Sequence, residues 1–305
     1  MAYCLQAIVF LSSLLENIGP NTRYEVYIMI PDLFDDKSKI RIKALMEKYG
    51  KEKIEIQYIN MKNSFKTAVT GDHISTTAYY RLLLPSMLPN IDKIIYSDCD
   101  VINFEDLTNL YNLQLKDNIY FRGLPDYNVH EDELRGFGVY SNFYMNSGIL
   151  LMNLKSLRKY GIERKIIDLC DNYYLEHHDQ TAINVICSKN IETLPIKYAM
   201  FNFESYGKLV EYNNGQKWGY RYSQKDLKEA FNRPVMLHFA GFDKPWNHKK
   251  VHFEEYWWFY AKKTDVYEDL LVTNEYLEEE VDLIIKKIPE NGGFLRNNIL
   301  INNNP

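Results

Sequence analysis

Cysteine is scarce in this sequence, and the few cysteines lie far apart. The 305 residues include four, Cys4, Cys99, Cys170 and Cys187, and no two of them form a C-x-x-C pair. This spacing argues against a disulfide framework or a zinc site and is typical of reduced thiols. We therefore expect a cytoplasmic protein.

Long apolar runs and blocks of positive charge are also missing. No window is long and apolar enough to cross a bilayer. The net charge is −5, with 36 Lys and Arg against 41 Asp and Glu and no basic block, so we expect no nucleic-acid partner. An anionic ligand would need individually placed cations.

The first twenty residues superficially resemble a signal peptide. They lack a basic leading region and a small-x-small cleavage site, and Leu5, Ile8 and Leu15 follow helical spacing. We interpret this segment as a buried helix that ends at Gly19 and Pro20.

Apolar strands alternate with amphipathic helices along most of the chain. The predicted strands cover 24–31, 53–60, 93–103, 118–125, 146–154 and 235–239; the predicted helices cover 35–50, 75–88, 155–174 and 179–188. This order predicts an α/β fold with a mostly parallel central sheet flanked by helices. We assign residues 1–249 to this domain and 250–305 to a C-terminal helical extension whose tail, 297–305, carries no pattern.

The stretch KIIYSDCDVIN places two carboxylates, Asp98 and Asp100, directly after an apolar strand. In an extended backbone, residues i and i+2 project to the same side, so both would face one point. A divalent cation between them would turn repulsion into attraction, and carboxylate oxygens suit Mn²⁺ or Mg²⁺. The alternative is a turn whose aspartates cap backbone amides.

A second candidate stretch is HFAGFDKPW, which begins at His238. His238 ends a predicted strand and could supply a third metal ligand, Gly241 allows close backbone approach to a ligand, and Lys244 adds a cation. The alternative is a hydrogen-bonded core histidine.

Four blocks, in this order, resemble the retaining glycosyltransferases of family 8, which include glycogenin and bacterial lipopolysaccharide galactosyl- and glucosyltransferases. The blocks are AYYRLLLPSMLPNIDKIIYSDCDVIN, YMNSGILLMNLKSLR, HHDQTAINVI and VMLHFAGFDKPW, within residues 3–272. The resemblance implies a GT-A fold and a UDP-sugar donor held through Mn²⁺. It further implies transfer of glucose or galactose to a glycan or lipid-linked glycan in cell-surface polysaccharide or lipopolysaccharide synthesis.

The resemblance also assigns roles to matching positions. Asp98, Asp100 and His238 would be the metal ligands, and Gly241 and Lys244 would meet the diphosphate.

Four further residues would meet the donor. Arg81 would reach the donor sugar or the diphosphate, and Asn146, Asp179 and Gln180 would surround the sugar. Alternative interpretations are an arginine paired with a nearby aspartate, a turn residue at Asn146 and an ordinary helix N-cap at Asp179. Because a neutral amide is a poor nucleophile, we favour front-side attack by the acceptor hydroxyl, with Gln180 in a positioning role.

The beginning of the chain departs from the family pattern. Family members open with a strand and a short loop, whereas Met1 to Tyr3 fall where that loop should end. We expect a vacant central strand position, explained by a start codon assigned too late or by truncation.

Other interpretations stay open. A phosphohydrolase of the D-x-D type would have Thr or Val where Ile102 stands, and a non-catalytic nucleotide-sugar or glycan binder would keep the fold without turnover. Tyrosine-rich segments 127–142 and 203–222 are candidates for the acceptor side. The aromatic C-terminal helices suggest peripheral contact with the inner membrane face, and the oligomeric state is left open.

Overall fold

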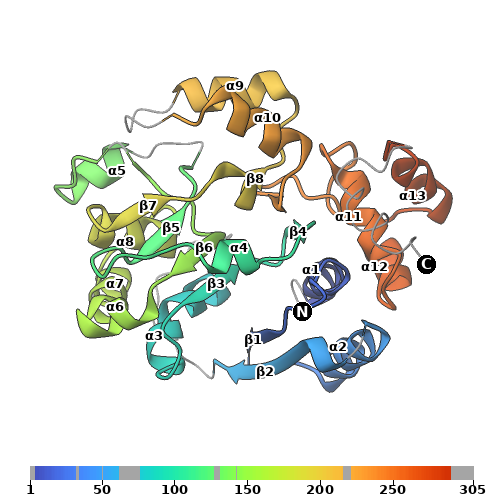
Figure 1. Cartoon of the computed structure of the whole chain (residues 1–305), viewed down its shortest axis with the longest axis horizontal. Helices are drawn as coiled ribbons and strands as arrows, with labels where there is room; N and C mark the ends of the chain where they lie inside the picture. Colours follow the sequence, from blue (N-terminus) through green and yellow to red (C-terminus); the bar gives the residue numbers. More distant parts are fainter. Residues whose placement is uncertain are drawn as a thin grey trace.

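The computed structural model describes residues 4–31, 34–49, 51–61, 76–126, 131–141, 143–215 and 221–289. Helices lie around the strands of the two larger sheets, and the two-stranded sheet lies at the lower edge of the molecule in Figure 1. The α/β prediction is confirmed. The strands form three groups: β1 (Tyr24–Ile30) with β2 (Ile54–Asn60); β3 (Ile94–Ser97), β6 (Ile149–Met152), β5 (Phe121–Gly123) and β7 (Ile191–Thr193); and β4 (Val101–Asn103), β9 (Met236–His238) and β8 (Met200–Phe201).

The strands are mixed in direction instead of mostly parallel. β6 runs antiparallel to both β3 and β5, and β4 runs antiparallel to β9, whereas the pairs β1–β2, β5–β7 and β8–β9 are parallel. An antiparallel neighbour needs no helical crossover. The chain leaves β5, makes an antiparallel bridge between Pro125 and Met145, and returns as β6.

The predicted strand 93–103 is two strands in different sheets. The backbone N–H of Asp98 donates to the Gly148 carbonyl at 2.7 Å, which extends the β3–β6 pairing. Only two residues later, the Asp100 carbonyl accepts from the Phe239 N–H at 2.9 Å, which extends the β4–β9 pairing. The chain therefore bends at Asp98–Asp100, and the expectation of an extended backbone there was wrong.

The predicted helices are present, with two changes of detail. The prediction at 155–174 is divided at Gly161, whose φ of 61° interrupts the helix, and the prediction at 75–88 begins as a 3₁₀ helix. The bounds of the helices up to residue 187 are: α1 (Cys4–Glu16), α2 (Asp36–Tyr49), η1 (Lys51–Lys53), η2 (Thr76–Leu83), α3 (Leu84–Met87), α4 (Thr108–Tyr111), α5 (Glu131–Gly136), α6 (Leu154–Lys159), α7 (Ile162–Asn172) and α8 (His178–Cys187).

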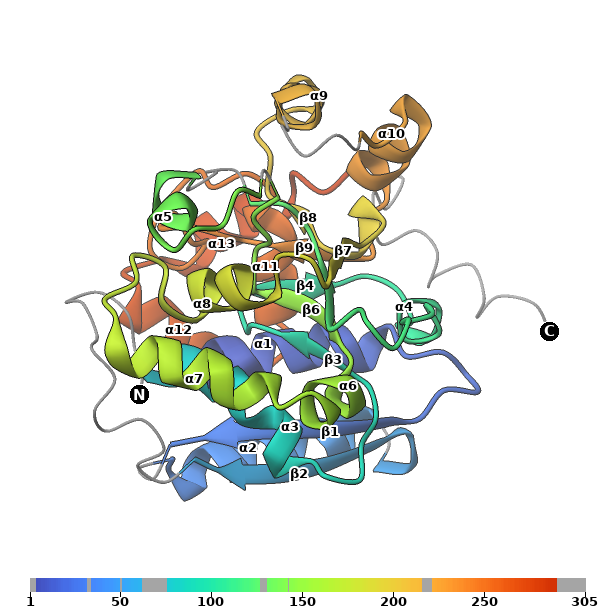
Figure 2. The ribbon, with the colours of Figure 1, turned by 90° about the vertical axis from the view of Figure 1, so that its left-hand side faces the viewer.

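Two hydrophobic cores lie on opposite faces of the four-stranded sheet. Along β6, Ile149 and Leu151 point into one core, and Leu150 and Met152 point into the other. The first core includes α1, and the second includes α7 and α8, which cover their side of the sheet in Figure 2.

The helices after residue 195 complete the first core. They are η3 (Ile196–Tyr198), α9 (Tyr206–Gly215), α10 (Gln224–Asn232), α11 (Glu254–Ala261), α12 (Tyr267–Thr273) and α13 (Glu278–Ile285). On α11, Trp257, Trp258 and Tyr260 are each 0% exposed. The Tyr260 hydroxyl lies 2.9 Å from Nδ2 of Asn17, just after α1. These aromatic side chains are buried in the first core and are therefore not available to contact a membrane surface.

Among the described residues, no helix has the length and apolar character to cross a membrane. The division at residue 249 stays a prediction, and the tail 297–305 lies outside the described residues.

Replacing Trp257 by alanine is expected to reduce the free energy of unfolding by about 3–5 kcal/mol, because it leaves a cavity in the core that α11 completes. The matched control is Leu283→Ala on α13, where the side chain is 64% exposed; a change within about 0.5 kcal/mol is expected there. Chemical denaturation measures both. Equal effects would contradict the placement of α11 in the core.

Candidate functional site

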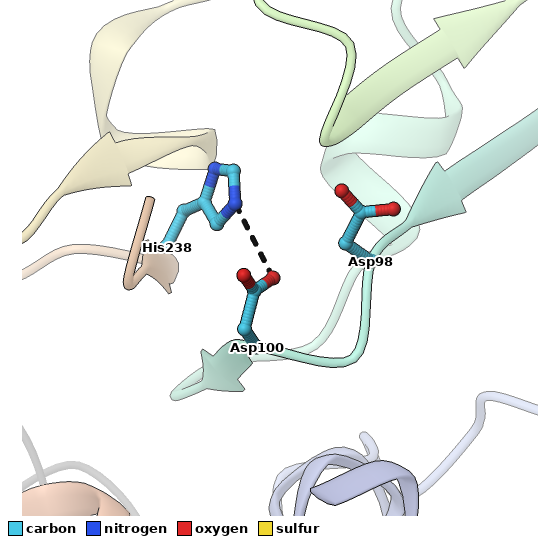
Figure 3. A group of neighbouring side chains, drawn as sticks. All are labelled: Asp98, Asp100 and His238. Atoms are coloured by element: carbon cyan, nitrogen blue, oxygen red, sulfur yellow. Dashed lines mark ion pairs between the residues drawn. The ribbon is translucent and has the colours of Figure 1, made fainter. Parts of the chain in front are cut away.

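Three candidate ligands, Asp98, Asp100 and His238, converge at the ends of strands from two sheets. One nitrogen or oxygen atom from each lies within 4.8 Å of the others, and His238 Nε2 is 3.3 Å from Asp100 Oδ1. Figure 3 shows both aspartates on the bend between β3 and β4, with the imidazole opposite them. The register of β4 with β9, in which Val101 is opposite His238, brings the histidine beside Asp100.

Gly148, at the start of β6, makes this convergence possible. A Cβ at this position would lie 2.3 Å from His238 Cε1 and 3.1 Å from Asp98 Oδ2. Any side chain would therefore displace the imidazole. Gly148 was not predicted; its signal in the sequence is a glycine two residues after Asn146, just before an apolar strand.

Asp100 carries its charge in a nearly closed environment, with 9% of its surface exposed. Burial raises its pKa, but His238 and Lys244 outweigh burial and hold the pKa well below its ordinary value. Lys244 Nζ lies 2.5 Å from Asp100 Oδ2 and also donates to the Phe239 carbonyl. The other oxygen, Oδ1, is buried and lies 3.3 Å from His238 Nε2, but it accepts no hydrogen bond from the residues described.

Arg81 forms an ion pair with Asp98. Its Nη2 lies 3.1 Å from Asp98 Oδ1, its Nε lies 3.0 Å from Asp179 Oδ2, and Nη1 donates to the Ser147 carbonyl. The Tyr96 hydroxyl donates to the same Asp98 oxygen at 2.6 Å, and its ring lies 4.5 Å from the guanidinium carbon. These bonds occupy Oδ1, while Oδ2 lies towards Gly148 and His238.

Asp179 lies in the first turn of α8, but its carboxylate pairs with Arg81 and does not cap the helix. Burial raises its pKa to about 6; Arg81 opposes this shift and Asp98 adds to it. The N-cap interpretation of Asp179 therefore does not describe its main contact.

Hydrogen bonds fix both ends of the Gln180 amide. Its Oε1 accepts from the Ser147 N–H at 2.9 Å, and its Nε2 donates to Asp126 Oδ2 at 3.0 Å. The same Asp126 oxygen accepts from Asn146 Nδ2 at 2.9 Å, and Asn146 Oδ1 accepts from the Gly148 N–H. Asp126, which the sequence analysis did not single out, thus links Gln180 to Asn146.

The loop after β9 holds the remaining candidates. Gly241 has a φ of 83°, a left-handed conformation that favours glycine, and no described atom lies within 4 Å of the Cβ position. Lys244 is 7% exposed and contacts Asp100. The structure therefore places Lys244 beside the three converging residues and Gly241 at the turn that leads to it.

Comparisons with known proteins show the family of this chain. The family model described as glycosyl transferase family 8 matches residues 1–250. The chain belongs to this family. General stress protein A of Bacillus subtilis (strain 168) is 28% identical over 248 residues, which cover 79% of this chain and 82% of that protein. Lipopolysaccharide 1,2-glucosyltransferase of Escherichia coli is 24% identical over 254 residues, covering 80% and 70% respectively.

The fold is similar to that of a family 8 enzyme of known structure. The galactosyltransferase LgtC, solved in complex with donor and acceptor sugar analogues, superimposes with a TM-score of 0.66 at 20% identity, covering 92% of this chain and 96% of that chain. This likeness shows the GT-A fold.

The residues present fit the divalent metal that family 8 enzymes generally bind. Two carboxylates and an imidazole are a suitable ligand set, Asp100 Oδ1 is an unsatisfied acceptor, and Gly148 keeps the space beside His238 and Asp98 clear. A cavity of about 340 Å³ beside α10 contains none of these three ligands; it is lined by Arg122, Leu194, Lys197, Tyr222, Asp226 and Glu229 among others.

Gly148→Ala is expected to weaken binding of Mn²⁺, used as a probe ion, by at least about tenfold, because the new methyl group displaces His238 from the aspartates. Gly207→Ala is the matched control, since the nearest atom to its added Cβ is Ser205 Oγ at 3.6 Å. Electron paramagnetic resonance of free Mn²⁺ gives the dissociation constants. Unchanged affinity in a folded Gly148→Ala protein would contradict this role.

The Asp179 carboxyl is expected to titrate near pH 6 in the metal-free protein, protonated below this midpoint and charged above it. Because the charge of Asp98 raises this pKa, Asp98→Asn should favour the charged form and lower the midpoint, whereas the exposed Asp92→Asn should leave it in place. Carbon-13 NMR of the carboxyl group follows the titration. A midpoint that does not move with Asp98→Asn would show that burial and Arg81 alone set it.

Proposed function

We propose that this family 8 glycosyltransferase is a retaining, Mn²⁺-dependent enzyme that transfers glucose or galactose from a UDP-sugar to a glycan acceptor. The observation that carries the proposal is the convergence of Asp98, Asp100 and His238 around a buried carboxylate oxygen with no hydrogen-bond partner among the described residues. Asp98, Asp100 and His238 would hold the ion, with Mg²⁺ as a substitute. When bound, the ion would neutralise negative charge on the diphosphate leaving group.

Lys244 supplies the second positive charge for the leaving group. It is paired with Asp100, so an ion on Asp100 would compete with it and free the ammonium for phosphate. A cation placed where negative charge grows lowers the barrier to bond breaking. The turn at Gly241 places this lysine beside the ligands, which agrees with a role for both residues at the diphosphate.

Arg81, Asn146, Asp179 and Gln180 would hold the donor sugar. Asp179 and Asp98 fix the guanidinium of Arg81 from two sides, and Asp126 fixes the amides of Gln180 and Asn146. Rigid side chains of this kind use the binding energy of the donor to hold its anomeric carbon in the orientation that the reaction needs.

The hydrogen bonds of Gln180 favour front-side attack by the acceptor hydroxyl. Gln180 Oε1, the only nucleophilic atom of the amide, already accepts from the Ser147 N–H, and a neutral amide is a weak nucleophile. Gln180 therefore acts by positioning and by its dipole on the oxocarbenium-like centre.

The acceptor would approach from the side of α5. In the segment 127–142, Tyr140 is 86% exposed and available to stack on a sugar ring. In 203–222, by contrast, Tyr212 and Tyr222 are buried and donate to the backbone carbonyls of Pro125 and Leu194. A glycan or lipid-linked glycan of the cell surface agrees with the lipopolysaccharide glucosyltransferase among the relatives, and synthesis of such a glycan would place the enzyme in the cytoplasm at the inner membrane face.

Mn²⁺-dependent release of UDP from a panel of UDP-sugars tests the proposal. We expect release from UDP-glucose or UDP-galactose, reduced at least about 100-fold by Asp100→Asn because the leaving group loses charge stabilisation. Asp92→Asn, on an exposed surface aspartate, should keep full activity.

Two results would contradict the enzyme proposal. Binding of UDP without turnover of any UDP-sugar would indicate a non-catalytic relic of the fold. Hydrolysis of an aryl phosphate that Asp98→Asn abolishes would instead indicate a D-x-D phosphohydrolase.

A further inference from the structure

A cavity of about 340 Å³ lies between α10 and the edge of the four-stranded sheet, and none of the three candidate metal ligands lines it. We call it the α10 cavity. β7 is the last strand of that sheet, and α10 lies above it in Figure 2. Residues 193–197 form the wall on the side of β7, Tyr222, Asp226 and Glu229 form the wall on the side of α10, and Arg122 of β5 reaches the cavity from the sheet. A volume of this size is typical of pockets that hold small ligands.

The strand register places the side chain of Arg122 on the same face of the sheet as α10. Phe121 points into the second core, so the next residue of β5, Arg122, leaves the sheet on the opposite face. Leu194, directly after β7, belongs to the first core, and its N–H donates to the Gly123 carbonyl at 3.0 Å. The strand pairing therefore continues to the wall of the cavity and holds that wall in place.

The charged groups around the α10 cavity balance one another. Two cations, Arg122 and Lys197, and two carboxylates, Asp226 and Glu229, line it. Lys197 Nζ lies 2.8 Å from Glu229 Oε1, and Arg122 forms an ion pair with Glu192. An anionic ligand would meet the two carboxylates and a cationic ligand the two cations. The wall therefore favours a ligand without net charge.

Polar atoms of the wall remain available for hydrogen bonds to such a ligand. Of the three nitrogens of Arg122, Nη2 donates to Glu192, whereas Nε and Nη1 donate to no described residue. Asp226 Oδ2 accepts from the N–H and the hydroxyl of Ser223, and no hydrogen bond from a described residue reaches Asp226 Oδ1. The cavity thus presents donors and an acceptor together. Hydroxyl groups suit this combination because each of them both donates and accepts.

The α10 cavity also has an apolar part. Leu194 and Ile196 belong to the first core, and Pro195 between them is exposed. Tyr222 is 4% exposed, and its hydroxyl donates to the Leu194 carbonyl at 2.7 Å, which holds the ring against this segment. A purely apolar ligand would cover the charged groups without replacing their hydration. A pyranose ring, by contrast, has C–H groups for the apolar segment and hydroxyls for the charged one.

We propose that the α10 cavity binds one neutral hexose unit, with its hydroxyls on Arg122 and Asp226 and its C–H groups on residues 194–196. The inference rests on the proposed function in one respect: a glycan acceptor would supply this hexose. β5 leads from Arg122 to Asp126, which accepts from the Gln180 amide, and four extended residues span at most about 14 Å. A short oligosaccharide could therefore have one end at the donor sugar and a later unit in the α10 cavity.

NMR titration of the isotope-labelled full chain tests the site. The probes are methyl α-glucopyranoside and methyl β-galactopyranoside, which carry hydroxyls and no charge. At least one of them should cause saturable shifts of the backbone amide signals of Lys197 and Tyr222. No shift of these signals with either probe at up to about 100 mM would overturn the proposal, since binding weaker than this is not specific recognition. Shifts at Gly148 and Gln180 alone would assign the sugar to the candidate active site and would also overturn it.

Glucose 6-phosphate tests the charge argument in the same titration. Its phosphate should make it bind no more tightly than the better neutral glycoside, because Asp226 and Glu229 line the cavity. Tighter binding of glucose 6-phosphate at Lys197 and Tyr222 would show an anion site and would overturn the assignment to a neutral hexose.

Arg122→Met should weaken binding of the glycoside at least about tenfold, because it removes charged hydrogen-bond donors from the cavity. The matched control is Arg233→Met, which also removes an ion pair with a glutamate, Glu105, but does not line the cavity; the affinity should stay unchanged. Unchanged affinity in a folded Arg122→Met protein would overturn the proposal, and if this variant does not fold, the titrations of the unmodified chain decide.

These titrations need neither Mn²⁺ nor a UDP-sugar, so the two proposals can fail separately. A chain that binds the glycoside at Lys197 and Tyr222 but releases no UDP would contradict the proposed function and leave the hexose site standing. A chain that releases UDP but shows no such binding would contradict the hexose site alone.

Discussion

Asp98 and Asp100 bring two negative charges into a poorly hydrated region, and the residues around them compensate those charges separately. Two like charges about 4 Å apart repel by about 4 kcal/mol at the effective dielectric near a protein surface. Arg81 and Tyr96 hold Asp98, whereas Lys244 and His238 hold Asp100. In each aspartate, one carboxylate oxygen accepts a hydrogen bond and the other lies on the side of His238. The fold therefore brings together the ligand atoms that a cation site needs.

Chain bending and close packing, more than any single motif, create this arrangement. The bend at Asp98–Asp100 moves the chain from one sheet to another within two residues, and the β4–β9 register supplies the histidine. Gly148 leaves room for both. Behind them, Asp126 and Asp179 fix the amides and the guanidinium that would meet the sugar. A shift in any of these elements would separate the ligands.

Much of this could be predicted from the sequence, for physical reasons that also explain the failures. Periodicity predicted most strands and helices, and residue chemistry identified Asp98, Asp100 and His238. The bend was missed because apolar residues stand on both sides of Asp98 and Asp100, and aspartates two positions apart fit one extended strand. Strand direction has no local signal, which is why the sheets were expected to be mostly parallel. Helix α10 was predictable, because Ser223 and Asp226 form a capping box at its start, whereas the link from Asp126 to Gln180 spans 54 positions and exists only in the fold.

The central claim is that a divalent ion belongs between Asp98, Asp100 and His238. Anomalous diffraction at the manganese edge, from crystals of the protein grown with Mn²⁺ and UDP, tests it most directly. The account predicts one strong peak within bonding distance of all three side chains, about 2.0–2.4 Å from their oxygen and nitrogen atoms, with Lys244 turned from Asp100 towards phosphate. A peak elsewhere, or none while Lys244 stays on Asp100 and UDP is bound, would contradict it.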